Sequence, residues 1–433
     1  MYNHIRLASV VSLVLALLFS GGCYNSVLGS FQFVSAQDEP YNVILMIGDG
    51  MGWEHIELGK LVEFGALGNL SMQQASLHLN VTTHNADSRT TDSAAAATAM
   101  ATGRKTDNGK ISVLPDGEPI DTILEIAQAN GKSTGLVATT LLQHATPAAF
   151  MTHVENRNNY SEITRQLVEE VGVDVLLGGG REYFSDSQLL AMEDAGYSIV
   201  YNRSDLLSIS SGSLLGLFAE QYLEYEEHRI FDTTPSLAEM TSKSLELLSQ
   251  DSDGFFLMVE GSKIDYAAHD HDRAGVALEV IAFHEAVSVA IEYMQGHSNT
   301  ILIVTADHET GGLTIAGDTL SDDLPNSALN EEQRRTLRTS RAVNITAFWS
   351  TTAHTNTTVP LFAFGDIFDE QVNGDVIDNT DIFFEMINFF SKDSAFRTDW
   401  NPENPPEFFT LMILTGSAIV ALVVLVVLWR RKQ

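Results

Sequence analysis

The chain has 433 residues and is 44% hydrophobic, enough for one large domain with a substantial core or for two or three smaller ones. Its 24 Lys and Arg residues stand against 57 Asp and Glu residues, which gives a net charge of −33. This charge argues against nucleic acid or an anionic membrane surface as a partner, because both would repel the protein. The composition also argues against a collagen-like, coiled-coil or wholly disordered chain.

The first 36 residues are typical of a secretion signal peptide. Arg6 supplies the positive end, residues 7–19 form an almost unbroken apolar run, and a small-residue cleavage site ends at Ala36. The sequence before Cys23 faintly resembles a bacterial lipoprotein site, although an incidental cysteine in the signal peptide is the favoured interpretation. Cleavage after Ala36 removes the only cysteine of the chain, so we expect no disulfide, thiol nucleophile or thiolate metal site.

Short apolar runs that alternate with helical patterns predict an α/β fold. The predicted strands are 42–47, 134–138, 174–177, 255–259, 300–305 and 360–364. The predicted helices are 92–101, 121–130, 235–249 and 276–294. Continuous apolarity indicates strands that are covered on both faces, as in a largely parallel central sheet flanked by helices on both faces. No linker divides the chain, so we expect one domain over residues 37–400, with a polar excursion at 317–341; the contribution of 186–232 stays open.

The C-terminus predicts a membrane anchor. Residues 401–407 contain three prolines and would form a stem, and 408–429 are 22 residues without a charge, long enough to cross a bilayer as a helix. The tail 430–433 begins with three cations, which favour the cytoplasmic side, so the domain is expected on the extracytoplasmic face of the membrane. A glycosylated outer surface is compatible with six Asn-X-Ser/Thr triplets, at Asn69, Asn80, Asn159, Asn202, Asn344 and Asn356.

Potential metal ligands follow four of the predicted strands. They are Asp49, Glu260, Asp307, His308 and, in a loop beyond a strand, His144 and Thr146. A single Asp after a strand is most often a turn or capping residue. The carboxyl ends of parallel strands, however, meet at one edge of a sheet, where ligands bind. Four strand ends with such side chains therefore favour a metal site at that edge.

Asp265 and His269 add a carboxylate and an imidazole with helical spacing. The two residues are four apart, so they lie on one face of a helical turn. Carboxylate and imidazole together suit zinc, whereas carboxylates, hydroxyls and water suit magnesium.

Ser93 stands at the start of a predicted helix. Asp92 or Thr91 can cap this helix and place Ser93 in its first turn, where free N–H groups favour an alkoxide or a phosphate. Taken alone, the segment Thr91-Asp92-Ser93 is as well explained by an ordinary capped helix.

Together these motifs resemble the alkaline phosphatase family, in order and in spacing, from about residue 42 to about 366. The matching segments are Gly48-Asp49-Gly50-Met51-Gly52, Thr91 through Ala99, His144 through Ala149, Arg157, Glu260 through His269, Ala306-Asp307-His308 and Ala353-His354-Thr355.

The resemblance implies two zinc ions and one magnesium ion. The first zinc would be held by Asp265, His269 and His354. The second would be held by Asp49, Asp307 and His308, with the Ser93 oxygen completing it. The magnesium would be held by Asp49, Thr146 and Glu260. Arg157, oriented by Asp92, would clamp the phosphate. Near them would lie His144 and Tyr266, two positions that vary in the family.

The implied function is hydrolysis of small phosphate monoesters through a phosphoseryl intermediate on Ser93. Nucleic acid is not expected as a specific partner, and a possible homodimer is left open. A phosphodiesterase of the same superfamily usually has a threonine nucleophile, and a sulfatase needs a Cys or Ser in a Cys/Ser-x-Pro-x-Arg setting. A non-catalytic surface glycoprotein with this fold would be favoured by a lost zinc ligand, and each of the six zinc-ligand positions carries a ligand-type residue.

Overall fold

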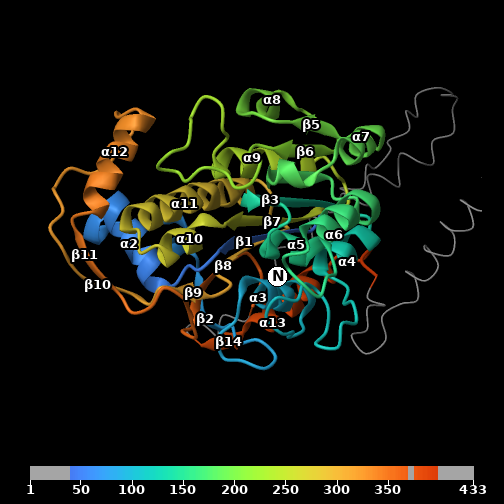
Figure 1. Ribbon diagram of the computed structural model, residues 1–433, viewed down its shortest axis with the longest axis horizontal. Helices are drawn as coiled ribbons and strands as arrows, with labels where there is room; N and C mark the ends of the chain where they lie inside the picture. Colours follow the sequence, from blue (N-terminus) through green and yellow to red (C-terminus); the bar gives the residue numbers. More distant parts are fainter. Residues whose placement is uncertain (1–39, 369–374, 398–433) are drawn as a thin grey trace, which may run out of the picture. The chain divides into compact units, whose positions relative to one another are not determined.

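The computed structural model describes residues 40–368 and 375–397 (Figure 1). The predicted signal peptide 1–36, stem 401–407, membrane helix 408–429 and tail 430–433 lie outside the described residues. Within the described part, one helix, α11 (Arg273–Gln295), is long and apolar enough to cross a membrane. Its most apolar window is 72% buried inside the protein, as expected for a helix of the core.

A ten-stranded sheet runs through the described residues in the order β14-β2-β13-β8-β1-β7-β3-β4-β6-β5. Its parallel central strands are β8 (Thr300–Thr305), β1 (Asn42–Gly48), β7 (Phe255–Gly261), β3 (Ser133–Leu141) and β4 (Val175–Gly179). The strands toward its two edges are β6 (Leu214–Leu217), β5 (Ser198–Val200), β13 (Val359–Phe364), β2 (Leu77–Thr82) and β14 (Val376–Asp378). Only β13 runs antiparallel to its neighbours among these described strands.

Helices cover both faces of this sheet, which confirms the predicted α/β class (Figure 1). One layer contains α2 (Trp53–Phe64), α9 (Leu237–Leu248) and α11. The other contains α3 (Ser93–Thr102), α4 (Ile123–Ala129), α5 (Ala145–Met151) and α13 (Asn379–Phe390). Shorter elements are α6 (Tyr160–Gln166), α10 (Lys263–His269), β9 (Glu309–Thr310), β12 (His354–Thr355), the 3-10 turns η1 (Gly65–Leu67), η2 (Ser71–Gln74) and η4 (Arg181–Tyr183), and the π turn η3 (Leu167–Val171).

Regular structure is present in two segments for which the sequence predicted none. They are 186–232, whose contribution was open, and 317–341, which was predicted only as a polar excursion. The segment 186–232 contains α7 (Asp186–Asp194), β5, α8 (Arg203–Ser208) and β6, so it extends one edge of the central sheet. The predicted excursion contains α12 (Glu331–Ala342), which lies between β10 (Leu313–Asp318) and β11 (Ile345–Trp349) in the chain. The two strands pair with each other in a separate antiparallel sheet.

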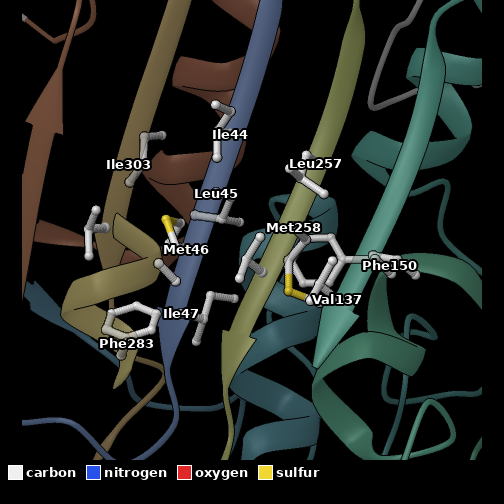
Figure 2. Packing of buried hydrophobic residues seen from close by; sticks show 14 of the residues in the cluster. Ile44, Leu45, Met46, Ile47, Val137, Phe150, Leu257, Met258, Phe283 and Ile303 are labelled. Carbon is white, nitrogen blue, oxygen red and sulfur yellow. The ribbon is translucent and has the colours of Figure 1, made fainter. Parts of the chain in front are cut away.

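The centre of the core is β1, whose seven residues are all buried. Figure 2 shows Ile44, Leu45, Met46 and Ile47 pointing alternately to the two faces of the sheet, against side chains from both neighbouring strands and from the helices. Because successive side chains of a strand point to opposite faces, a strand covered by two helical layers must be apolar at every position. This explains why the sequence shows β1 as a continuous apolar run.

Candidate metal and phosphate site

The sheet register brings three carboxylates to one edge. Ile47 of β1 pairs with Glu260 of β7 on one side and with Thr305 of β8 on the other. Asp49 and Asp307 each follow two residues later, so they leave the sheet beside Glu260. The backbone N–H of Gly50 donates to Asp307 Oδ1 at 3.1 Å, which connects the end of β1 with the end of β8. The strand-end prediction for these carboxylates agrees with this geometry.

Several oxygen atoms at this edge are buried without a hydrogen-bond partner among the described residues. They are both carboxylate oxygens of Asp49 and of Glu260, Asp307 Oδ2 and Thr146 Oγ1. Burial and the neighbouring carboxylates raise the pKa of Asp49 well above its usual value, and burial raises the pKa of Glu260 to about 8 and of Asp307 to about 7. Burying unpaired carboxylates is unfavourable, and bound cations would compensate their charge and fill their free lone pairs. The donor set therefore fits metal ions.

Asp49, Asp307 and His308 form one candidate ligand group, with their donor atoms within 4.8 Å of one another. His308 Nε2 lies 3.3 Å from Asp307 Oδ2 and 3.5 Å from Asp49 Oδ1. The same nitrogen is 3.2 Å from the hydroxyl of Ser93. The structure thus brings together the three residues predicted for the second zinc and places the predicted nucleophile beside them.

A second ligand group lies next to that of Asp49, Asp307 and His308. It consists of Asp265, His269 and His354. His269 Nε2 lies 3.2 Å from His354 Nε2 and 3.3 Å from Asp265 Oδ1. His308 also borders this group, because its ring stacks on that of His354 with centroids 3.6 Å apart, and the donor atoms of Asp265, His308 and His354 lie within 4.8 Å. The residues predicted for the first zinc are therefore adjacent to those predicted for the second, with His308 between them.

Hydrogen bonds on the far side of the imidazoles aim their Nε2 atoms at the site. His269 Nδ1 lies 2.6 Å from the carbonyl oxygen of Thr352, and His354 Nδ1 lies 3.0 Å from that of Thr91. A carbonyl only accepts, so each Nδ1 carries a proton, and in the neutral form of each ring the Nε2 lone pair is available to a metal. The hydrogen bond to Asp265 raises the pKa of His269 to about 9, so a metal must displace a proton there.

Thr310 orients the His308 ring in the same way, through a hydrogen bond to Nδ1. The sequence did not identify this residue. Its hydroxyl donates to Asp265 Oδ1 at 2.5 Å and lies 3.2 Å from His308 Nδ1, from which it accepts. Burial holds the pKa of His308 well below its usual value, so this imidazole is neutral. A threonine two residues after a histidine has no distinctive pattern, and only the fold shows its role.

The third ligand group is rich in oxygen. The donor atoms of Asp49, His144 and Glu260 lie within 4.8 Å of one another. The hydroxyl of Thr146 is close enough to Glu260 to act on the pKa of that carboxyl. The group thus contains two of the three residues predicted for magnesium, Asp49 and Glu260, with His144 as its third member and Thr146 near Glu260, and the oxygen donors suit that ion.

The helix start at Ser93 is built around Asp92. Asp92 caps α3, because its Oδ1 accepts from the N–H of Ala95 at 3.0 Å. Its Oδ2 accepts from the N–H of Gly109 at 2.9 Å and from Arg157 Nη1 at 3.0 Å. One carboxylate therefore fixes both the helix that carries Ser93 and the guanidinium that was predicted to clamp phosphate.

His144 connects this guanidinium with Tyr266. Arg157 Nη2 donates to His144 Nε2 at 3.1 Å, and the hydroxyl of Tyr266 lies 3.3 Å from the same nitrogen. Burial lowers the pKa of His144 to about 3, so the ring is neutral. Because Nε2 accepts, the proton is on Nδ1, which is buried and points away from Arg157. His144 thus holds the second terminal nitrogen of the guanidinium, and Tyr266 contacts His144.

A parallel sheet whose strand ends bring metal-type ligands around a serine at a helix N-terminus defines a metal-dependent hydrolase. A family model described as alkaline phosphatase matches residues 41–338. Alkaline phosphatase 3 of Bacillus subtilis is 41% identical over 299 residues, which are 65% of this chain and 64% of the relative. The chain belongs to the alkaline phosphatase family, whose members are phosphomonoester hydrolases.

Solved structures agree with this assignment. A cold-active alkaline phosphatase from Shewanella sp. matches with a TM-score of 0.70 and 32% identity, over 81% of this chain and 99% of that one. A mutant alkaline phosphatase of the Antarctic bacterium TAB5, solved with magnesium in its M3 site, matches with a TM-score of 0.69 and 30% identity, over 82% and 99% of the two chains.

Proposed function

We propose that this protein hydrolyses small phosphate monoesters through a phosphoseryl intermediate on Ser93. The observation that carries the proposal is the position of the Ser93 hydroxyl. It lies at the N-terminus of α3, 3.2 Å from His308 Nε2, where the two groups of imidazole and carboxylate ligands meet. The free N–H groups of a helix N-terminus favour a phosphate at this point.

Two zinc ions and one magnesium ion fit the three ligand groups. Asp265, His269 and His354 would hold one zinc, and Asp49, Asp307 and His308 the other. The magnesium would be held by Asp49, Thr146 and Glu260. Bound there, the ions would supply the positive charge that favours a serine alkoxide and that stabilises the attacking and leaving oxygens of an in-line displacement. A histidine-to-glutamate mutant of the TAB5 alkaline phosphatase with magnesium in its M3 site supports magnesium as one of the three.

The side chains of the protein position the ester and the nucleophile. Arg157, held by Asp92 and His144, presents a planar guanidinium with the geometry to bind two phosphoryl oxygens. Ser93 Oγ forms a bond to phosphorus while the bond from phosphorus to the ester oxygen breaks, and the alcohol leaves with a proton. A water oxygen then bonds to phosphorus, the bond to Ser93 Oγ breaks, and inorganic phosphate and the free serine result.

The experiment that tests this proposal measures release of phosphate from 4-nitrophenyl phosphate at alkaline pH, with and without a chelator. Acid quenching during turnover, followed by peptide mass spectrometry, should find phosphate on the peptide that contains Ser93. Metal analysis of the purified protein should find zinc and magnesium in a ratio of two to one. A metal-loaded, folded protein that releases no phosphate would contradict the proposed activity.

We further propose that the protein is anchored in a membrane, with the catalytic domain on the extracytoplasmic face. The support is the uncharged run 408–429 followed by cations, and the apolar signal-like run at the N-terminus. Fractionation of cells that express the full chain, with protease added from outside, tests the anchor and its orientation. Light scattering on the detergent-solubilised protein decides whether it forms a homodimer.

A further inference from the structure

Four tyrosines form two edge-on ring pairs, of which Tyr160 and Tyr266 lie near Arg157, and we call them the tyrosine wall: Tyr160, Tyr183, Tyr222 and Tyr266. The hydroxyl of Tyr266 lies 3.3 Å from His144 Nε2, the nitrogen that accepts from Arg157. The ring of Tyr222 stands edge-on to that of Tyr266, with centroids 5.5 Å apart. Tyr160 and Tyr183 form a second edge-on pair at 4.9 Å.

Tyr160 connects the two pairs. Burial and the nearby hydroxyl of Tyr222 raise the pKa of Tyr160, and the positive charge of Arg157 opposes this shift. Tyr160 is therefore within electrostatic reach of both Tyr222 and the guanidinium. The wall thus extends from the proposed phosphate clamp outward to Tyr222, whose surface is 40% exposed.

Tyr222 is exposed, but its backbone is held firmly on the N-terminal side. Residues 219–221 run along residues 180–182, with hydrogen bonds from Gly180 N to Gln221 O at 2.8 Å and from Glu182 N to Glu220 O at 3.1 Å. Gly179 permits this approach, since a Cβ there would lie 2.0 Å from the carbonyl oxygen of Gln221.

The C-terminal side of Tyr222 is held by the ammonium group of Lys263 on α10. This group lies 4.0 Å from the ring centroid of Tyr225 and 5.7 Å from those of Tyr222 and Tyr266. One residue further on, the N–H of Glu226 donates to Glu279 Oε1 at 2.6 Å. A cation shared among three rings aligns the segment with α10, which also carries the ligands Asp265 and His269.

We propose that Tyr222, together with Tyr266, forms the subsite for the alcohol part of the ester and selects planar aromatic groups, as in nucleoside or aryl monophosphates. The inference rests on the proposed function, because it assumes a phosphate bound at Arg157. An aromatic ring that is exposed and yet held in place loses little conformational freedom on binding, so stacking against it favours affinity. The substrate class follows from the flat, exposed ring of Tyr222, which is connected to the clamp through Tyr266 and His144.

Adenosine 5′-monophosphate and ribose 5-phosphate provide a matched test, because both release phosphate from the same type of primary alcohol and differ in the base. We would measure kcat/KM for both on the metal-loaded full chain and on Tyr222→Ala and Tyr222→Phe. Tyr201→Ala is the matched control, since Tyr201 is 43% exposed and packs on Arg181 instead. Inhibition by inorganic phosphate reports whether the clamp is intact.

Wild type should prefer the nucleotide, and Tyr222→Ala should lower kcat/KM for the nucleotide about tenfold, the size of one base–aromatic stack. In Tyr222→Ala, kcat/KM for ribose 5-phosphate and the inhibition constant of phosphate should be unchanged. Tyr222→Phe should keep the preference for the nucleotide, and Tyr201→Ala should behave as wild type. An equal loss for both esters, or no loss for either, would overturn the inference.

A failure of the proposed function gives a different result. In that case folded, metal-loaded wild type releases phosphate from neither ester. The inference is still tested by calorimetric binding of the two compounds to Ser93→Ala with and without Tyr222→Ala. If Tyr222→Ala removes the tighter binding of the nucleotide, the result supports the subsite. If the two compounds bind equally to both proteins, the result contradicts it.

Discussion

Replacing Arg157 by alanine should weaken catalysis without abolishing it. The guanidinium donates to Asp92 at 3.0 Å and to His144 at 3.1 Å, and its side chain is 21% exposed. A hydrogen bond to a charged group contributes about 1.5–3 kcal/mol, so loss of the clamp should lower kcat/KM by roughly one to two powers of ten. His308→Ala should cost far more, because His308 lies between the two ligand groups that surround Ser93.

The assay is kcat/KM for 4-nitrophenyl phosphate together with the inhibition constant of inorganic phosphate. Arg157→Ala should bind phosphate more weakly and should remain folded, because Asp92 keeps its hydrogen bonds from Ala95 and Gly109. Arg165→Ala is the matched control, since that arginine pairs only with glutamates of its own segment in the described structure and should not affect activity. An Arg157→Ala enzyme indistinguishable from the control would refute the clamp, and a loss as large as that of His308→Ala would refute the division of roles.

Four further changes test other parts of the site and the fold. Ser93→Ala should abolish activity at an unchanged melting temperature, measured by calorimetry, because the first turn of a helix accepts alanine; a folded, active variant would exclude Ser93 as the nucleophile. Prolonged chelation should abolish activity and lower the melting temperature, since it returns unpaired carboxylates to a buried site, and added zinc and magnesium should restore both. Truncation before Phe408 should give a soluble, active enzyme; a folded but inactive product would contradict the proposed anchor. His153→Gln should lower the free energy of unfolding by about 2 kcal/mol at pH 6, measured by denaturant titration, and by less at pH 9. Burial favours neutral His153, but the Glu125 carboxylate outweighs this effect and raises the His153 pKa. The stabilisation is therefore full below about pH 6.5 and is lost as the pH rises through the raised pKa.

The sequence predicted the longer strands that are buried on both faces and missed the half-buried and the very short ones, including β6, which is buried throughout. The six predicted runs all form strands, because only a doubly covered strand is apolar at every position. β2 alternates between buried and half-buried residues, and β5 and β6 have only three and four residues, too few for a pattern. The antiparallel direction of β13 was also beyond prediction, because apolarity does not encode direction.

The candidate site was predictable where its residues follow strands. Asp49, Glu260 and Asp307 could be found from that rule alone. Arg157 lies in a polar loop and His354 in the two-residue strand β12, neither of which has a recognisable pattern, so only the resemblance to a family pointed to them. Contacts such as that of Thr310 with His308, or of Tyr222 with Tyr266, depend on segments that meet only in the folded chain, and a single sequence contains no signal for them.

The hydrogen bond from Gly50 to Asp307 spans 257 residues, and this separation sets an order of events during synthesis. A nascent chain that ends before Thr300 lacks β8, so β1 has an unpaired edge and Asp49 has neither Asp307 nor His308 beside it. The ligand groups are therefore completed late, after most of the sheet has been translated. On the proposed function, metal loading would belong to the final stage of maturation, and a truncated or stalled chain would contain no complete ligand group with which to retain a metal ion.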